Sequence, residues 1–276
     1  MIKTLVSLNA DLASDITFRY SCRLSQLTDM NLQAIHIEEM ESNPPGTGWV
    51  RNTLEQGLLH TAQEEISGLI KAAQSSYHSL DAPIIRVGDP ERELLREIKD
   101  GSYDLFMEGI LNSFSPVNFK KRLQSGLYRN APCPMLLVKN LVELNRAAFL
   151  LNDNTDLTSC ISTFLKIFTK PEPEVDLIHF SFPESGRKGF NEKVEEAGAS
   201  SHKNSDKILE NAEAILKKNG RDRRESRIIR DTPEKLNEFL ADYGLIVTQM
   251  PRNPSQKSNV MELLSHVPTA ILLCRK

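Results

Sequence analysis

Short apolar runs alternate with longer amphipathic stretches along the first half of the chain. Each run is continuous, as expected for a strand buried on both faces, and apolar residues recur at helical spacing in the stretches between them. Asp11 and the pair Asp89-Pro90 are typical helix starts, because Asp caps the first amides and proline suits the first turn. The predicted strands are residues 3–8, 32–38, 83–87, 104–107 and 135–138, and the predicted helices follow Asp11, the loop 43–48 and Asp89 and cover about 117–129.

The second half follows the same plan, with strands at 147–151, 175–180, 228–230, 245–248 and 270–274 and helices at 157–168, at 206–218 and from Thr232 onward. Four segments recur in the same order. They are NADLAS (9–14) as NTDLTS (154–159), AIHI (34–37) as LIHF (177–180), IIR (84–86) as IIR (228–230), and APCPMLLVK (131–139) as VPTAILLCR (267–275). The offsets of 145, 143, 144 and 136 residues indicate an internal duplication. We therefore predict two domains, 1–142 and 143–276.

The alternation of strands and helices also predicts the fold class. Such strands pair in parallel through right-handed crossovers. We expect an α/β protein of two doubly wound domains, each a five-stranded, mostly parallel sheet with helices on both faces. Ligands of these sheets lie beyond the carboxyl ends of the strands. In the first copy those ends are Asn9, Ile37 and residues 87–89 and 108–112.

Composition narrows the class of protein further. Hydrophobic residues make up 39% and charged residues 26% of the chain, as in an ordinary globular protein. The formal net charge of −3 leaves no overall basic field for nucleic acid or anionic lipid. Four widely spaced cysteines without a CxxC pair favour reduced, mostly buried thiols. No stretch suits a signal peptide or a membrane span, so we expect a cytoplasmic protein.

Four segments of the first copy carry a family resemblance. LVSLNADLAS ends the first strand with a polar residue, AIHIEE forms the second strand, and VGDPERELLREIKDGSYDLFMEG leads to the terminal APCPMLLVK. Together they resemble the universal stress protein family, and the second copy does so more weakly through LIHF and VPTAILL. The resemblance implies five-stranded α/β domains that act in stress responses, usually pair as dimers and, in one subgroup, bind ATP. It further implies that the two domains pack as an internal pseudo-dimer.

The resemblance also supplies candidate ligand residues. The ATP-binding members end the first strand with Asp and follow the fourth with a Gly-x2-Gly-x9-Gly-Ser/Thr run, whose amides hold the phosphates. Here Asn9 replaces the Asp, Gly109 matches the first glycine and Asn112 replaces the second, while Lys121 and Arg122 stand near the final pair. With ATP or AMP as the ligand in domain 1, the candidate residues are Asn9, Ile37, Gly109, Asn112, Lys121 and Arg122.

The second copy departs further from the family pattern. Met250 falls at the first glycine position, Asn253 at the second and Lys257 with Ser258 at the final pair. The loop is five residues shorter than its counterpart and contains two prolines, which remove amides and restrict the backbone. We predict a degenerate domain 2 that does not bind ATP in the family manner.

Each candidate also has a structural interpretation. The basic residues 120–122 form either a solvated helix face or a phosphate site. Asn9 and Asn154 suit the entry to a helix. His36 and His179, at equivalent strand positions, are interpreted as buried histidines held by hydrogen bonds. The basic run KKNGRDRRESR (217–227) is interpreted as a solvated loop, with a docking patch for an acidic partner as the alternative.

The sequence contains no metal-ligand spacing, Walker motif or nucleophile–base constellation, so we predict neither a metal site nor a catalytic residue. The first hypothesis is a non-enzymatic, cytoplasmic tandem universal stress protein that works through protein contacts, with ATP binding degenerate or lost. The alternative is a nucleotide sensor whose domain 1 binds AMP or ATP and hydrolyses it slowly. The expected partners are the other domain of the same chain, a second copy in a homodimer and an unknown protein, with no nucleic acid and no membrane.

Overall fold

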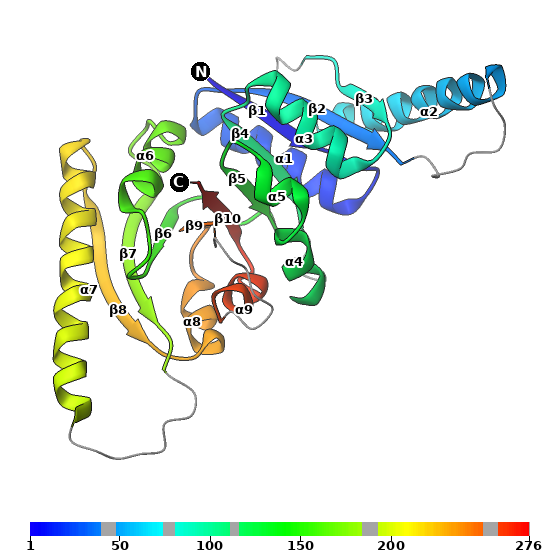
Figure 1. Cartoon of the computed structure of the whole chain (residues 1–276). Coiled ribbons are helices and arrows are strands. Elements are labelled where there is room, and N and C mark those ends of the chain that lie inside the picture. The colour runs from blue at the N-terminus through cyan, green and yellow to red at the C-terminus, as the bar shows by residue number, and fades with distance from the viewer. Residues whose placement is uncertain (40–47, 74–80, 111–115, 184–192, 251–258, 276) are drawn as a thin grey trace. The chain divides into compact units, whose positions relative to one another are not determined.

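The computed structural model describes residues 1–39, 48–73, 81–110, 116–183, 193–250 and 259–275. Asn112, one of the candidate ligand residues, lies outside these ranges. Contacts divide the chain into two compact units, Met1–Leu141 and Val142–Lys276, which we call unit 1 and unit 2. Strands and helices alternate along each of them (Figure 1).

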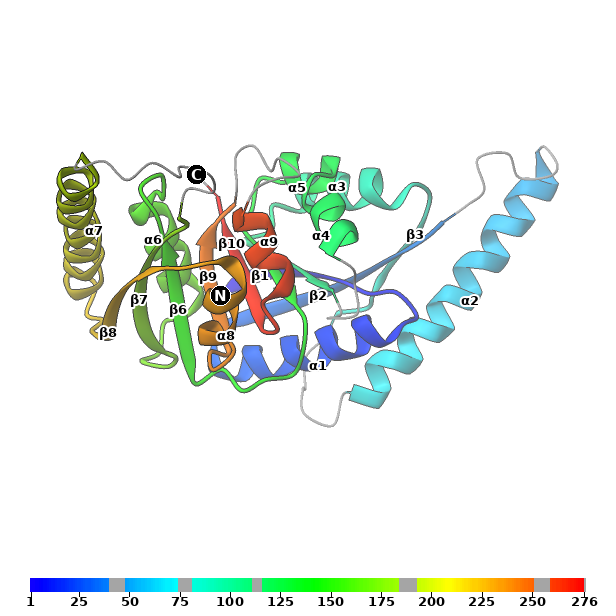
Figure 2. The same ribbon diagram turned by 90° about the horizontal axis from the view of Figure 1, so that it is seen from below.

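Unit 1 is a parallel sheet with the strand order β3-β2-β1-β4-β5. Helices α1 and α2 pack together on one face, and α3, α4 and α5 lie on the other (Figure 2). In chain order the elements are β1 (Ile2–Ser7), α1 (Leu12–Leu27), β2 (Met30–Glu38), α2 (Trp49–Ala73), β3 (Ile84–Val87), α3 (Pro90–Gly101), β4 (Leu105–Gly109), α4 (Pro116–Leu123), α5 (Gly126–Asn130) and β5 (Met135–Val138).

Unit 2 repeats this topology with the order β8-β7-β6-β9-β10, again all parallel. Helix α6 packs with α7 and helix α8 with α9. The elements are β6 (Arg146–Leu151), α6 (Leu157–Ile167), β7 (Glu174–Ser181), α7 (Lys193–Lys218), β8 (Arg223–Arg230), α8 (Pro233–Leu240), β9 (Leu245–Gln249), α9 (Asn259–His266) and β10 (Ala270–Cys274).

The predicted fold class is confirmed: each unit is a five-stranded parallel sheet with helices on both faces. Central strands carry fully buried side chains such as Leu5 and Phe106 in unit 1 and Phe149 in unit 2, and each such burial contributes about 1.5–3 kcal/mol. The predicted cap Asp11 accepts a hydrogen bond from the Ser14 N–H, and Asp89 accepts one from the Arg92 N–H, each at 2.8 Å.

Some elements differ from the prediction. The stretch 117–129 forms two helices, α4 and α5, with Ser125 between them as the N-cap of α5. Helix α7 begins at Lys193 instead of residue 206, and its first half is too polar to show helical periodicity. Strand β8 begins at Arg223, where RRESR offers no apolar signal and the pairing with β7 decides the structure. Helix α9 was not predicted at all.

Candidate functional site

Three predicted site residues lie at the carboxyl ends of neighbouring strands in unit 1. Asn9 follows β1 and is exposed; its N–H donates to Ser14 Oγ (2.6 Å) and its carbonyl oxygen accepts from the Asp11 N–H (2.8 Å). Ile37 lies in β2 opposite Arg86 of β3 and is buried. The backbone of Asn9 therefore shapes the entry to α1, as the structural interpretation of this residue expects.

Gly109, the third of these residues, is the last residue of β4 and packs against α1. A Cβ atom at this position would lie 2.3 Å from Thr17 Oγ1 and 2.4 Å from the Ala13 carbonyl oxygen. Neither contact is tolerable, so only glycine lets the first turns of α1 approach the end of β4 this closely. The glycine thus has a packing reason to be present, whatever its part in ligand binding.

Arg122 belongs to a side-chain cluster that we call the Glu108 cluster, made of Glu108, Arg122, Tyr128 and Glu91. Glu108, near the end of β4, accepts hydrogen bonds from the Arg122 guanidinium and from the Tyr128 hydroxyl. Glu91 Oε1 lies 3.6 Å from Arg122 NH1, and the guanidinium stands 5.6 Å from the centre of the Tyr128 ring. Arg122 is therefore held by carboxylates on the side of the sheet covered by α3 to α5.

The charge of Arg122 is largely neutralised inside this cluster. Burial alone would lower the pKa of Arg122, but the attraction of Glu108, with help from Tyr128 and Glu91, raises it instead. Burial, followed by the adjacent Glu108 carboxylate, raises the pKa of the Tyr128 hydroxyl well above its ordinary value. A phosphate would have to compete with Glu108 for Arg122. Lys121, by contrast, is exposed on α4.

Lys139 is a cation at the same edge that sequence reasoning did not select. It directly follows β5, is only 3% exposed, and its Nζ lies 4.6 Å from the centre of the Phe119 ring on α4. Burial lowers the pKa of Lys139 to about 7, which brings its loss of charge close to neutral pH. The signal that would have found it is a lysine immediately after the last strand of a sheet whose ligand edge is formed by strand ends.

The two strand histidines are buried and hydrogen-bonded, as the structural interpretation predicted. His36 Nδ1 lies 2.8 Å from the Leu8 carbonyl oxygen, and Nε2 lies 3.0 Å from Glu38 Oε2. His179 Nε2 lies 3.3 Å from Asp153 Oδ1, but its buried Nδ1 has no hydrogen-bond partner among the described residues. Both units therefore place a carboxylate against the imidazole of the second strand, from different positions in the chain.

The environment of His179 predicts a pH dependence of stability. Burial lowers the pKa of His179, although Asp153 opposes this shift. The unfolded chain takes up a proton near pH 6.5, whereas the folded protein does so at lower pH, so the unfolded state binds more protons below about pH 6.5. The free energy of unfolding should therefore fall between pH 7.5 and 5.5. Urea titrations at the two pH values should show a smaller fall in stability for His179→Gln than for the unmodified protein. His60→Gln, whose side chain is exposed, should show the same fall as the unmodified protein.

The equivalent edge of unit 2 is closed by a side chain. Leu105 begins β4 and pairs with β1, and Leu245 begins β9 and pairs with β6, so these two leucines are counterparts. Four residues further along each strand lie Gly109 and Gln249, which are therefore counterparts as well. The prediction that Met250 takes this place was wrong by one residue, because the offset between the copies changes along the chain. Gln249 Oε1 accepts a hydrogen bond from the Asp156 N–H at 2.8 Å. Asn253, Lys257 and Ser258 lie outside the described residues.

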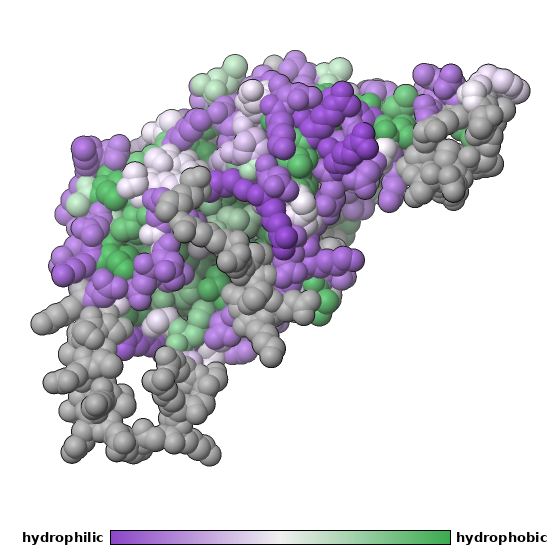
Figure 3. Space-filling model, in the orientation of Figure 1, coloured by the Kyte–Doolittle hydropathy of each residue, from purple (hydrophilic) through white to green (hydrophobic). Residues whose placement is uncertain are grey.

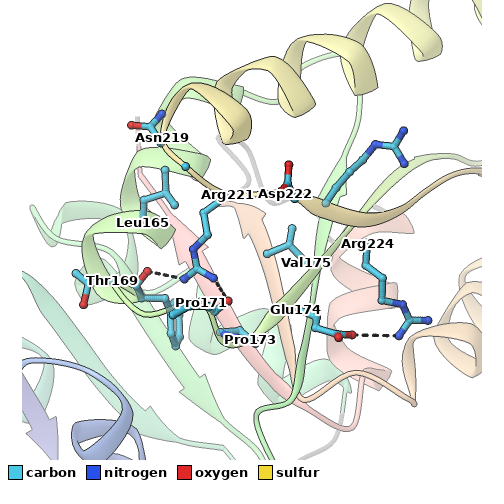
Figure 4. A pocket seen from close by; sticks show the side chains of 13 residues that line it. Leu165, Thr169, Pro171, Pro173, Glu174, Val175, Asn219, Arg221, Asp222 and Arg224 are labelled. Atoms are coloured by element: carbon cyan, nitrogen blue, oxygen red, sulfur yellow. Dashed lines mark hydrogen bonds and ion pairs between the residues drawn. The ribbon is translucent and has the colours of Figure 1, made fainter.

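A hollow of about 760 Å³ lies at the opposite end of unit 2, beside the amino ends of β7 and β8 (Figure 4). Arg221 at its wall is 8% exposed and donates to the carbonyl oxygens of Phe168 (2.7 Å), Pro171 and Glu172 (3.5 Å). Arg224 pairs with Glu174 at 3.4 Å. The interpretation of the basic run 217–227 as a solvated loop was wrong, because α7 ends at Lys218 and residues 223–227 belong to β8. Between these elements, Arg221 is buried and holds the segment after α6.

Other chemistry finds little support in the described part of the chain. It contains no group of three or more His, Cys, Asp or Glu side chains that could hold a metal ion. All four cysteines are buried, as predicted, and none of them is joined in a disulfide. Among the helices described, none is long and apolar enough to cross a membrane.

Comparison with known proteins identifies the fold. A universal stress protein from Archaeoglobus fulgidus matches with a TM-score of 0.62 and 13% identity, over 100% of this chain and 96% of its own. A protein of unknown function from Pseudomonas aeruginosa (TM-score 0.58, 12% identity, 100% and 92% covered) is also similar. Another P. aeruginosa protein, described as a universal stress protein, matches with a TM-score of 0.58 and 13% identity, over 100% of this chain and 93% of its own. No family model and no curated protein matches the sequence.

The two units are thus doubly wound α/β domains. Along its whole length the chain has the fold of a universal stress protein, and the resemblance drawn from the sequence is confirmed.

Proposed function

We propose that this chain is a cytoplasmic tandem universal stress protein that acts in a stress response through contacts with other proteins, and that its family-type ATP binding is degenerate or lost. The observation that carries the proposal is the Glu108 cluster. Arg122, the strongest candidate for a phosphate contact, is already paired with a carboxylate of its own unit. Lys139 is too deeply buried to carry a full charge at neutral pH. A triphosphate at this edge would have to compete with Glu108 for Arg122, and the exposed Lys121 alone would not replace the lost glycine-rich loop.

Unit 2 supports the same proposal. Gln249 at the end of β9 accepts a hydrogen bond from the N–H of Asp156, the N-cap of α6, whereas unit 1 has a glycine at this position. The sequence carries no catalytic motif, so we propose a binding protein rather than an enzyme. Packing of the two domains as an internal pseudo-dimer and the formation of a homodimer remain predictions.

A nucleotide sensor is the second candidate function. It is favoured by the exposure of Asn9 beyond β1 and of Lys121 on α4, which leaves both residues accessible to a ligand. In that case unit 1 would bind AMP or ATP through the predicted residues and hydrolyse it slowly at most.

Nucleotide carried through purification separates the two candidates. Freshly purified protein is denatured, and the supernatant is analysed by anion-exchange chromatography for adenine nucleotides. If ATP binding is lost, the supernatant should contain far less than one adenine nucleotide per chain. Recovery near one AMP or ATP per chain would replace it by the nucleotide sensor.

A further inference from the structure

Strand β8 is the outer strand of the unit 2 sheet, and helix α7 lies beside it and packs on β7 and β8 (Figure 1). Strand β8 pairs with β7 on one side, and the described residues contain no strand on its other side within unit 2. None of its eight residues is buried, although six of the eight residues of β7 are. The outer strand of unit 1, β3, has only four residues. The outer strand of unit 2 is therefore the longer of the two, and an outer strand is a template for one more strand.

A hollow of about 460 Å³ adjoins this outer strand. Arg227, Ile228 and Ile229 of β8 line it, together with Asp231 and with Lys235 and Phe239 of α8. Side chains of consecutive strand residues point to opposite faces. Arg227, which stacks on Phe239 of α8, therefore shares one face with Ile229, and the hollow lies on the α8 side of this outer strand. A segment that paired with β8 would find a place there for one of its side chains.

The charge of β8 indicates what kind of segment fits. The strand RRESRIIR contains four arginines and one glutamate. Arg223 pairs with Glu213 of α7 at 2.7 Å and Arg224 with Glu174 of β7 at 3.4 Å, so the charge that matters for a partner is that around Arg227.

Arg227 pairs with Glu225 of the same strand at 2.8 Å and stacks on the Phe239 ring at 5.1 Å, while Lys235 pairs with Asp231 at 3.4 Å. The Arg227 side chain is 48% exposed and the Lys235 side chain 68%, and such ion pairs are weak in water and easily exchanged. An incoming carboxylate can compete for both cations.

We propose that the β8 edge binds an extended acidic segment of a partner protein as a sixth strand of the unit 2 sheet. The segment places an apolar side chain beside Phe239 and a carboxylate against Arg227 or Lys235. Backbone pairing supplies affinity, and the hollow supplies specificity, as in other cases of strand addition. A second copy of this chain is a poorer occupant, because its own β8 would bring four more arginines to the interface. This inference rests on the proposed role in protein contacts and names the surface and the chemistry of the partner.

The test uses the full chain and two pools of end-blocked, fluorescein-labelled eight-residue peptides. One pool alternates Asp or Glu with Val, Ile or Leu, and the other has Lys in place of the acids. Fluorescence polarisation should show saturable binding of the acidic pool alone. Arg227→Glu combined with Lys235→Glu should weaken that binding by at least about tenfold. The matched control is Arg92→Glu with Arg96→Glu on α3, whose surface is hydrophilic (Figure 3), and it should leave binding unchanged.

Hydrogen exchange on the unmodified protein gives a readout that no variant can confound. The acidic pool should protect backbone amides within 223–230. Failure of the acidic pool to bind up to about 1 mM, equal loss of binding in both double variants, or protection confined to other strands would overturn the inference. These outcomes do not depend on nucleotide content. If no peptide binds and no nucleotide is recovered, only the docking role of the β8 edge is rejected. If about one nucleotide per chain is recovered, the proposed function itself is rejected.

Discussion

Replacing Gly109 by alanine should lower the free energy of unfolding by about 2–3 kcal/mol, because overpacking against fixed neighbours costs this much. The new Cβ would meet the Ala13 carbonyl oxygen, which is backbone, and the Thr17 hydroxyl, which donates to that same carbonyl at 2.7 Å. Neither atom has room to withdraw, so α1 must move away from the end of β4. Urea unfolding followed by circular dichroism measures the change.

Gly57→Ala is the matched control for this substitution. Gly57 lies in α2, and nothing stands within 4 Å of the position its Cβ would take. Alanine should be neutral there or stabilise the helix by up to about 1 kcal/mol. If Gly109→Ala were as well tolerated as Gly57→Ala, the packing role assigned to Gly109 would be refuted. The glycine would then need a ligand to explain it.

Glu108→Ala should be comparably damaging, at about 2–3 kcal/mol, below the cost of breaking a fully buried ion pair because both partners keep some solvent contact. The substitution leaves the Arg122 guanidinium without its main carboxylate and the buried Tyr128 hydroxyl without its acceptor. Thermal or urea unfolding of the variant gives the value directly.

A double-mutant cycle shows whether Glu108 and Arg122 act as a pair. Arg122→Ala should also destabilise the protein, and the double variant should lose clearly less than the two single losses added together. The exposed pair of Asp15 with Arg19 is a suitable comparison and should show little coupling. Strict additivity at Glu108 and Arg122 would mean that the ion pair does not form in solution. Arg122 would then be available to bind a phosphate.

The sequence sufficed for most of the fold because the buried strands are continuous apolar runs. FLL in β6 and AILLC in β10 have no other plausible role in a globular protein. Strand β8 escaped prediction over 223–227 because an edge strand needs no buried face, and RRESR satisfies its neighbours through pairing alone. The first half of α7 escaped for a similar reason, since no apolar stripe marks it.

The candidate site was predictable in position but not in its electrostatics. The strand ends that carry Asn9 and Gly109 follow from the alternation of elements. The pairing of Arg122 with Glu108 does not, because it depends on how α4 is rotated over the sheet across fourteen residues of separation. The replacement of Gly109 by Gln249 in unit 2 was hidden by a shift of one residue between the copies. Arg221 looked like a solvated cation because its partners are carbonyl oxygens, which no sequence pattern reveals.

Calorimetric titration of the intact chain with ATP tests most directly whether unit 1 has lost its nucleotide site. With Arg122 committed to Glu108, the account predicts no saturable heat at ATP concentrations up to about 1 mM. Saturable binding near one site per chain would contradict it, most clearly if Lys121→Ala with Arg122→Ala abolished that binding in a protein that remained folded.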